Sequence, residues 1–148
     1  MTELLTSLIA WTVANTIYAI PPQPPVLAYQ SDTFFAEELC SPRAARSNVH
    51  CAFRAYYRDG TGTITLHENY VDAQDDPRAR ALLVHEIVHY LQDDSGNWGE
   101  KTCQSWIERE REALRLQHLY LVKQTGNYHL YLPSPSASQC PQNLSGKG

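Results

Sequence analysis

The residues best suited to chemistry are His85, Glu86 and His89, which stand in the spacing His-Glu-x-x-His. They lie in a run of good helix formers, residues 79–92, that contains neither Gly nor Pro. Positions four apart lie above one another on a helix, so both imidazoles can reach one metal ion. Glu86 follows about 100° further around the helix. Its carboxylate is thereby placed beside the metal, where a general base for a metal-bound water belongs.

The alternative interpretation is a pair of buried core histidines held by hydrogen bonds. Burying two imidazoles and a carboxylate among apolar residues costs on the order of several kcal/mol unless something pairs with them. A divalent cation provides that partner, and imidazole with carboxylate ligands in tetrahedral geometry favours zinc. We therefore predict Zn²⁺ as the cofactor. The apolar neighbours are Leu82, Leu83, Val84, Ile87, Val88, Tyr90 and Leu91.

A catalytic zinc ion usually has three protein ligands, so a carboxylate from a second helix is expected. Residues 102–123 predict a long helix that carries Glu108, Glu110 and Glu112. At about 100° per residue, Glu110 lies in the middle of an apolar stripe about 160° wide. Glu108 and Glu112 fall among arginines and are expected to be solvated surface charges. Glu110 is therefore the predicted third ligand. The stripe comprises Cys103, Trp106, Ile107, Ala113, Leu114, Gln117, Tyr120 and Leu121.

The pattern resembles the gluzincin branch of the zinc metallopeptidases, to which thermolysin belongs. His-Glu-x-x-His is followed, after the twenty residues 90–109, by Glu110 and then by Ala113 three residues later. The short chain is most similar to the minigluzincins, and the resemblance covers about residues 64–121. It implies zinc bound by His85, His89 and Glu110, with Glu86 as the catalytic base. The implied reaction is hydrolysis of a peptide bond, in a peptide or protein substrate, by a metal-activated water.

Larger relatives stabilise the oxyanion with a His or Tyr from a C-terminal subdomain that this chain lacks. Four residues near the end of the chain are candidates for that role, and the sequence does not choose among them: Tyr120, Tyr128, His129 and Tyr131. The competing function is a latent or non-catalytic zinc-binding scaffold with its cleft blocked by the tail or the N-terminal segment. A thiolate from Cys140 on the zinc is one form of latency. Glu86 argues against a purely structural site, which needs no base.

Length and composition indicate one domain, residues 1–132, followed by a flexible Pro/Ser-rich tail, residues 133–148. The apolar fraction of 43% can build one core. A net charge of -4 without a long basic run gives no indication of nucleic acid or a membrane surface as partner. The tail is expected to be mobile unless Cys140 attaches it. The oligomeric state does not follow from the sequence.

Residues 2–16 predict an amphipathic helix, although a retained secretory leader is the alternative. The run is too short and too polar to span a bilayer. The side expected to face the core comprises Leu4, Leu5, Leu8, Ile9, Trp11 and Thr12. The prolines at 21–25 then indicate a stiff connector.

The remaining segments predict an α+β fold. Strands are expected at 26–30, 51–58 and 61–67, the last two joined by a turn at Asp59 and Gly60. Helices are expected at 33–40, from Asp76 to about Gln92, and from 102 to a stop at Gly126. The resemblance implies a zincin-like fold with a small three-stranded sheet on an N-terminal backing helix, an active-site helix and a glutamate helix. It also implies that the 51–58 strand is the edge to which an extended peptide adds.

Four cysteines allow three pairings, of which Cys40 with Cys51 and Cys103 with Cys140 are nearest in order. The even count favours an oxidising compartment, hence a periplasmic or secreted protein. No CxxC occurs, which argues against a cysteine zinc site. The remaining histidines are interpreted as surface or strand-end residues rather than ligands: His50, His67, His118 and His129.

Overall fold

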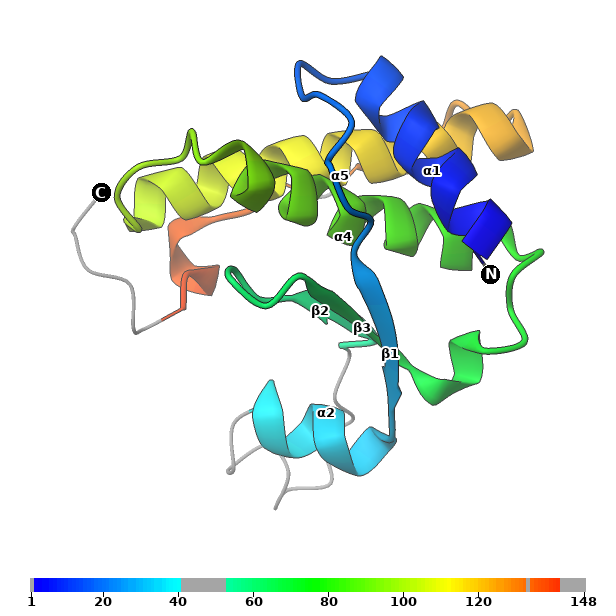
Figure 1. The fold of residues 1–148 in the computed structure, drawn as a ribbon, viewed down its shortest axis with the longest axis horizontal. Coiled ribbons are helices and arrows are strands. Elements are labelled where there is room, and N and C mark those ends of the chain that lie inside the picture. Colours follow the sequence, from blue (N-terminus) through cyan, green and yellow to red (C-terminus); the bar gives the residue numbers. More distant parts are fainter. Residues whose placement is uncertain (1, 41–52, 133, 142–148) are drawn as a thin grey trace.

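The computed structural model describes residues 2–40, 53–132 and 134–141. A three-stranded sheet has α4 on one side, with α1 and α5 packed against α4, and α2 on the other side (Figure 1). This arrangement confirms the expected α+β class. The elements are α1 (Thr2–Ala14), β1 (Val26–Gln30), α2 (Asp32–Glu38), β2 (Ala55–Tyr57), β3 (Thr63–His67), the 3-10 turn η1 (Glu68–Tyr70), α4 (Pro77–Ser95), α5 (Cys103–Thr125) and the 3-10 turn η2 (Ala137–Gln139).

The sheet has the order β1-β3-β2, with β1 parallel and β2 antiparallel to β3. The hairpin expected around Asp59 and Gly60 is present, and Gly60 adopts a φ of 84° that favours glycine. Tyr56 pairs with Thr65 in the register of this hairpin. Strand β2 is shorter than expected within the described residues, because Phe53, Arg54 and Arg58 lie outside it. As the outer strand next to β3, β2 has one edge that pairs with no other strand of the described residues.

Helix α4 has a favourable capping residue at each end. The Asp76 side chain accepts a hydrogen bond from the backbone N–H of Arg78, and Gly96 closes the helix in the left-handed conformation. The expected end near Gln92 is therefore wrong, since the helix continues to Ser95, the residue before this glycine. Helix α5 begins after Thr102, which forms a capping box with Ser105, and it ends at Thr125 with the predicted stop at Gly126.

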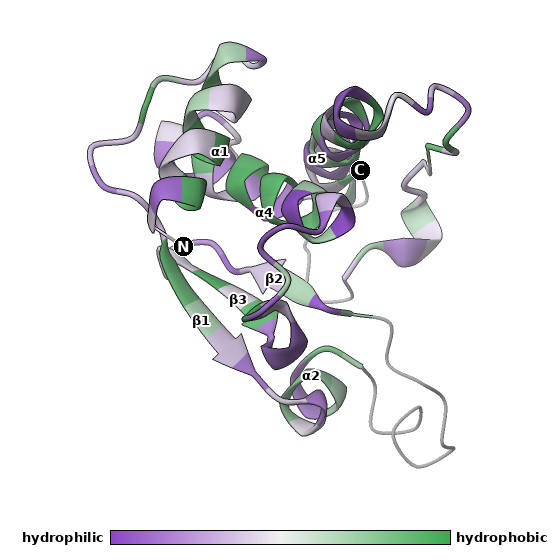
Figure 2. Cartoon of the chain, turned by 90° about the vertical axis from the view of Figure 1, so that its right-hand side faces the viewer, coloured by the Kyte–Doolittle hydropathy of each residue, from purple (hydrophilic) through white to green (hydrophobic). Residues whose placement is uncertain are grey.

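The core lies between α4, its neighbouring helices and the sheet, and Figure 2 shows hydrophobic segments on each of these elements. Ile64 and Leu66 of the central strand point into it, together with Ala55 of β2. On α1, four of the six expected core residues are buried, whereas Leu4 and Trp11 are partly buried. The buried side of α4 comprises Ala81, Leu83, Val84, Glu86, Ile87, Val88, Tyr90, Leu91 and Gln92.

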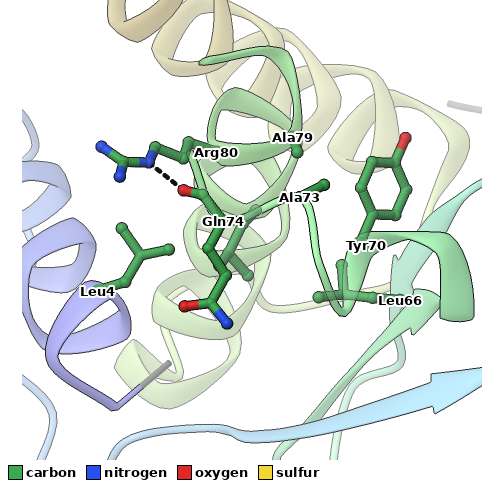
Figure 3. Close-up of a pocket in the computed structure, with 8 residues that line it drawn as sticks. Leu4, Leu66, Tyr70, Ala73, Gln74, Ala79 and Arg80 are labelled. Carbon is green, nitrogen blue, oxygen red and sulfur yellow. Dashed lines mark hydrogen bonds between the residues drawn. The ribbon is translucent and has the colours of Figure 1, made fainter. Parts of the chain in front are cut away.

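The connection between β3 and α4 is fixed to the first turns of α4. Arg80 donates a hydrogen bond from Nε to the carbonyl oxygen of Gln74 (Figure 3). A small, mostly apolar pocket between this connection and α1 is lined by Leu4, Leu66, Tyr70, Ala73, Gln74, Ala79, Arg80 and Leu83. The start of α4, and with it the orientation of the His-Glu-x-x-His segment, is therefore set by contacts with both α1 and β3.

A disulfide joins Cys103, the first residue of α5, to Cys140 and confirms that expected pairing. It attaches the described part of the tail to α5, which η2 also contacts. A free Cys140 thiolate as zinc ligand is therefore wrong, since this sulfur is bonded to another. The expected Cys40–Cys51 pair includes Cys51, which lies outside the described residues. None of the helices in residues 2–40, 53–132 and 134–141 has the length and apolar character needed to cross a bilayer.

Leu116→Ala tests the contact between α5 and the core. Leu116 is fully buried, so removal of its side chain should lower the free energy of unfolding by about 2–5 kcal/mol. Leu132→Ala is the matched control, because Leu132 is 40% exposed and should change stability by less than about 0.5 kcal/mol. Urea denaturation measures both, and equal effects would contradict the described burial of α5.

Candidate metal centre

Three potential ligand atoms meet where α4 lies beside α5. The Nε2 atoms of His85 and His89 are 3.2 Å apart. One oxygen of Glu110 lies 2.8 Å from Nε2 of His89, and its other oxygen lies 3.4 Å from Nε2 of His85. The three side chains form a group in which one atom from each lies within 4.8 Å of the others. The structure thus brings together all three residues that the sequence predicts as metal ligands.

These separations suit a zinc ion. Tetrahedral zinc with bonds of about 2.0–2.1 Å to nitrogen and oxygen requires ligand atoms about 3.3 Å apart. The observed separations of 2.8–3.4 Å, which involve both oxygens of Glu110, are of this size. Two facing imidazole nitrogens and a carboxylate are also a donor set that zinc prefers. The side chains are only 12%, 12% and 21% exposed, so the group is shielded and still reachable from solvent.

Glu110 lies at the border of the buried side of α5, not in its middle. The buried residues of this helix, Ala113, Leu116, Tyr120 and Val122, are centred about a quarter turn away from it. The expected position in the centre of the stripe is therefore wrong, and Leu114 is only half-buried. A border position explains how Glu110 can face both α4 and the solvent.

The ionised form of Glu110 is strongly favoured. Burial alone would raise the pKa of this carboxyl group. Hydrogen bonds from His85 and His89, together with their charge, outweigh burial and hold the pKa well below its ordinary range. Glu110 therefore presents a carboxylate, which is the form that binds a metal.

Glu86 lies next to this group, on the interior side of α4. It is 4% exposed, and its Oε2 is the one buried side-chain polar atom among the described residues without a hydrogen-bond partner. Burial raises the pKa of Glu86 to about 7, and the charge of Glu110 adds to this effect. The charge of His85 and a backbone hydrogen bond from Tyr57 act in the opposite direction. A carboxyl group with a pKa near neutrality can both accept and release a proton.

The outer nitrogens of the two imidazoles contact glutamine side chains. Nδ1 of His85 lies 2.9 Å from Oε1 of Gln117, and Nδ1 of His89 lies 2.9 Å from Oε1 of Gln92. Such contacts leave Nε2 of each ring facing the metal position. Sequence reasoning missed this role. In the sequence, the available signal was that Gln92 is a polar residue among apolar neighbours of the same helix. The structure shows that this side chain is fully buried.

A second set of polar contacts joins α5 to the β2–β3 hairpin. Arg109 donates two hydrogen bonds of 2.7 Å to the carboxylate of Asp59, which lowers the pKa of Asp59.

Glu112 accepts hydrogen bonds from Tyr18 at 2.6 Å and from Gln92 at 3.0 Å. The expectation that Glu112 is a solvated surface charge is therefore wrong, because Glu112 is half-buried and has two side-chain hydrogen-bond partners. Glu108 is exposed as expected.

The other candidate residues lie elsewhere. His67 is a buried strand-end residue whose Nε2 lies 2.7 Å from Asp32. Among the oxyanion candidates, Tyr120 is buried against Trp11 of α1, with ring centroids 5.0 Å apart. Tyr128, His129 and Tyr131 are exposed. The described residues therefore do not place any of these side chains in the metal group, and His50 lies outside them.

A family model described as Domain of unknown function (DUF6647) matches residues 1–133. The chain belongs to this family. The DUF6647 match spans the sheet, all the described α-helices, and the group formed by His85, His89 and Glu110. Searches of curated proteins and of solved structures found no match.

Glu86→Gln should stabilise the protein in the presence of a chelator. Because burial raises the pKa of Glu86 from 4.5 to about 7, the folded state binds this proton more tightly than the unfolded state. As the pH rises from about 4.5 to above 7, the free energy of unfolding of the wild type should therefore fall by about 3 kcal/mol. Glutamine cannot ionise, so near pH 8 the variant should be more stable than the wild type by a similar amount.

Urea denaturation at pH values from about 4 to 8 measures this difference. Glu108→Gln is the control, because Glu108 is an exposed residue of α5. The difference between Glu86→Gln and the wild type should grow with pH and then level off. A difference that is the same at every pH would contradict the buried, neutral carboxyl group.

Proposed function

We propose that this DUF6647 chain is a small zinc-dependent peptidase of zincin-like fold. One observation carries the proposal: Oε2 of the buried Glu86 has no hydrogen-bond partner, and this carboxyl group interacts electrostatically with His85 and Glu110 of the converging ligand group. A structural zinc site is closed by four protein ligands. Three ligands with a carboxyl group beside them instead suit an ion that has a position left for water.

Metal binding and proton transfer fall to different residues in the proposed mechanism. His85, His89 and Glu110 would hold the zinc ion, which when bound lowers the pKa of water and polarises a carbonyl group. Glu86 accepts the proton released as water attacks the peptide carbonyl. The same carboxyl group then donates that proton to the leaving amine. Its pKa near neutrality suits both steps, because neither protonation state is strongly disfavoured.

Strand β2 would bind the substrate. It pairs with β3 on one side and contacts α4, where the backbone of Tyr57 is close enough to Glu86 to lower the pKa of its carboxyl group. An extended peptide can add to the free edge of such a strand through backbone hydrogen bonds. This mode would bring a peptide bond next to the ligand group without requiring a particular side chain, so we propose a peptide or protein as substrate.

Cleavage of a mixed peptide library by the zinc-loaded protein tests the proposal. Glu86→Gln should keep one zinc ion per chain and lower kcat/KM by about 10²- to 10⁴-fold, since it removes only the base. Glu110→Gln should instead lose zinc affinity. Zinc content by atomic absorption and product detection by mass spectrometry separate the two effects. Cleavage that persists in Glu86→Gln would contradict the role of this residue.

The alternative is a latent or non-catalytic zinc-binding module. The disulfide attaches the tail to α5 at Cys103, seven residues before Glu110. Seven residues are about two helical turns, so the tail could reach the site. A chain that ends at residue 132 and carries Cys103→Ser tests latency. If the full chain binds zinc without cleaving any peptide, activity in the shortened chain indicates latency. Inactivity in both indicates a non-catalytic module.

A further inference from the structure

The contact between His89 and Gln92 is fixed by other residues. Gln92 is fully buried on the last turns of α4. Its Oε1 lies 2.9 Å from Nδ1 of His89 and 3.1 Å from Nε of Arg109. Its Nε2 lies 3.0 Å from the carbonyl oxygen of Arg109 and 3.0 Å from Oε1 of Glu112. The amide therefore has four hydrogen-bond contacts, which use the full capacity of the group.

The chemistry of these partners allows only one orientation of the amide. A guanidinium group can only donate hydrogen bonds, so the atom of Gln92 that faces Nε of Arg109 must be the oxygen. A carbonyl oxygen and a carboxylate can only accept them, so the atom facing Arg109 O and Glu112 must be the NH₂ group. Because Oε1 can only accept, Nδ1 of His89 must carry the hydrogen in their contact. Nε2 of His89, which contacts Glu110 at 2.8 Å, is then the nitrogen that can bind a metal once it has given up its proton.

We propose that Gln92 is a positioning residue that holds His89 in its metal-binding tautomer, with Arg109 and Glu112 fixing the Gln92 amide. This inference rests on the proposed zinc site and identifies what orients one of its ligands. The same contacts extend to the substrate strand. Arg109 is held by two hydrogen bonds to Asp59, in the turn that follows β2. The β2–β3 hairpin and the ligand His89 are thereby joined through Arg109 and Gln92.

The acceptor of the hydrogen bond from His89 is the neutral amide of Gln92, and this explains why position 92 requires glutamine. A carboxylate at position 92 could also accept from His89 and Arg109. Its second oxygen would face the carboxylate of Glu112 and the carbonyl oxygen of Arg109, which are both acceptors. Repulsion between these oxygens would turn the side chain away from His89. Glu112→Gln would supply an NH₂ donor at that point and relieve part of the repulsion.

A double-mutant cycle tests the proposal through zinc affinity, which chelator competition measures without reference to cleavage. Gln92→Glu should weaken zinc binding by about 10- to 100-fold, as expected when the hydrogen bond to a ligating His is lost. Gln92→Glu combined with Glu112→Gln should recover a substantial part of this loss. The charge control is Gln124→Glu, an exposed position on α5, which should bind zinc as the wild type does.

Long-range ¹⁵N–¹H NMR of the zinc-loaded protein gives a second readout. His89 should have its proton on Nδ1 in the wild type, and this signal should weaken or shift in Gln92→Glu. Wild-type zinc affinity in Gln92→Glu, no recovery in the double variant, or a proton on Nε2 of His89 would each overturn the proposal. A wild type that binds zinc but cleaves no peptide would refute the peptidase function alone, since affinity and NMR still decide the role of Gln92.

Discussion

The structure depends on the cost of burying two imidazoles and two carboxyl groups between packed helices. Such groups are unfavourable in an apolar interior unless each has a partner. Here His85, His89 and Glu110 satisfy one another within 3.4 Å, which requires α4 and α5 to lie side by side in one register. A slip of either helix by one turn would separate these atoms. The caps at Asp76 and Thr102 help to fix where each helix starts.

Polar contacts outside the metal group keep that register. Gln92 joins α4 to α5, and Arg109 joins α5 to the hairpin. Asp93, the next residue of α4, accepts hydrogen bonds from Tyr57 of β2 and from the backbone N–H of Gly60. The sheet edge proposed to bind substrate is thus attached to the same turn of α4 that carries His89. Movement of the hairpin would be transmitted to the ligand group through these residues.

Much of this arrangement could be predicted from the sequence because it follows from helix geometry. The i, i+4 spacing of His85 and His89 and the left-handed stop at Gly126 are local properties, and both are found in the structure. The surroundings of Glu112 could not be predicted in this way. A helical wheel counts apolar neighbours on one helix, whereas Tyr18 reaches Glu112 from a distant segment. The same holds for Arg109, whose partner Asp59 is fifty positions earlier in the chain.

The Cys103–Cys140 bond has a consequence for the unfolded chain. It closes a loop between residues 37 positions apart, which removes conformations from the unfolded ensemble and should favour folding by about 4 kcal/mol. That contribution is comparable with the total stability of a marginal domain. Reductants would therefore restore entropy to the denatured state without altering the ligand atoms. The fraction of folded protein, and hence the number of assembled sites, would then vary with the thiol–disulfide balance of the surroundings.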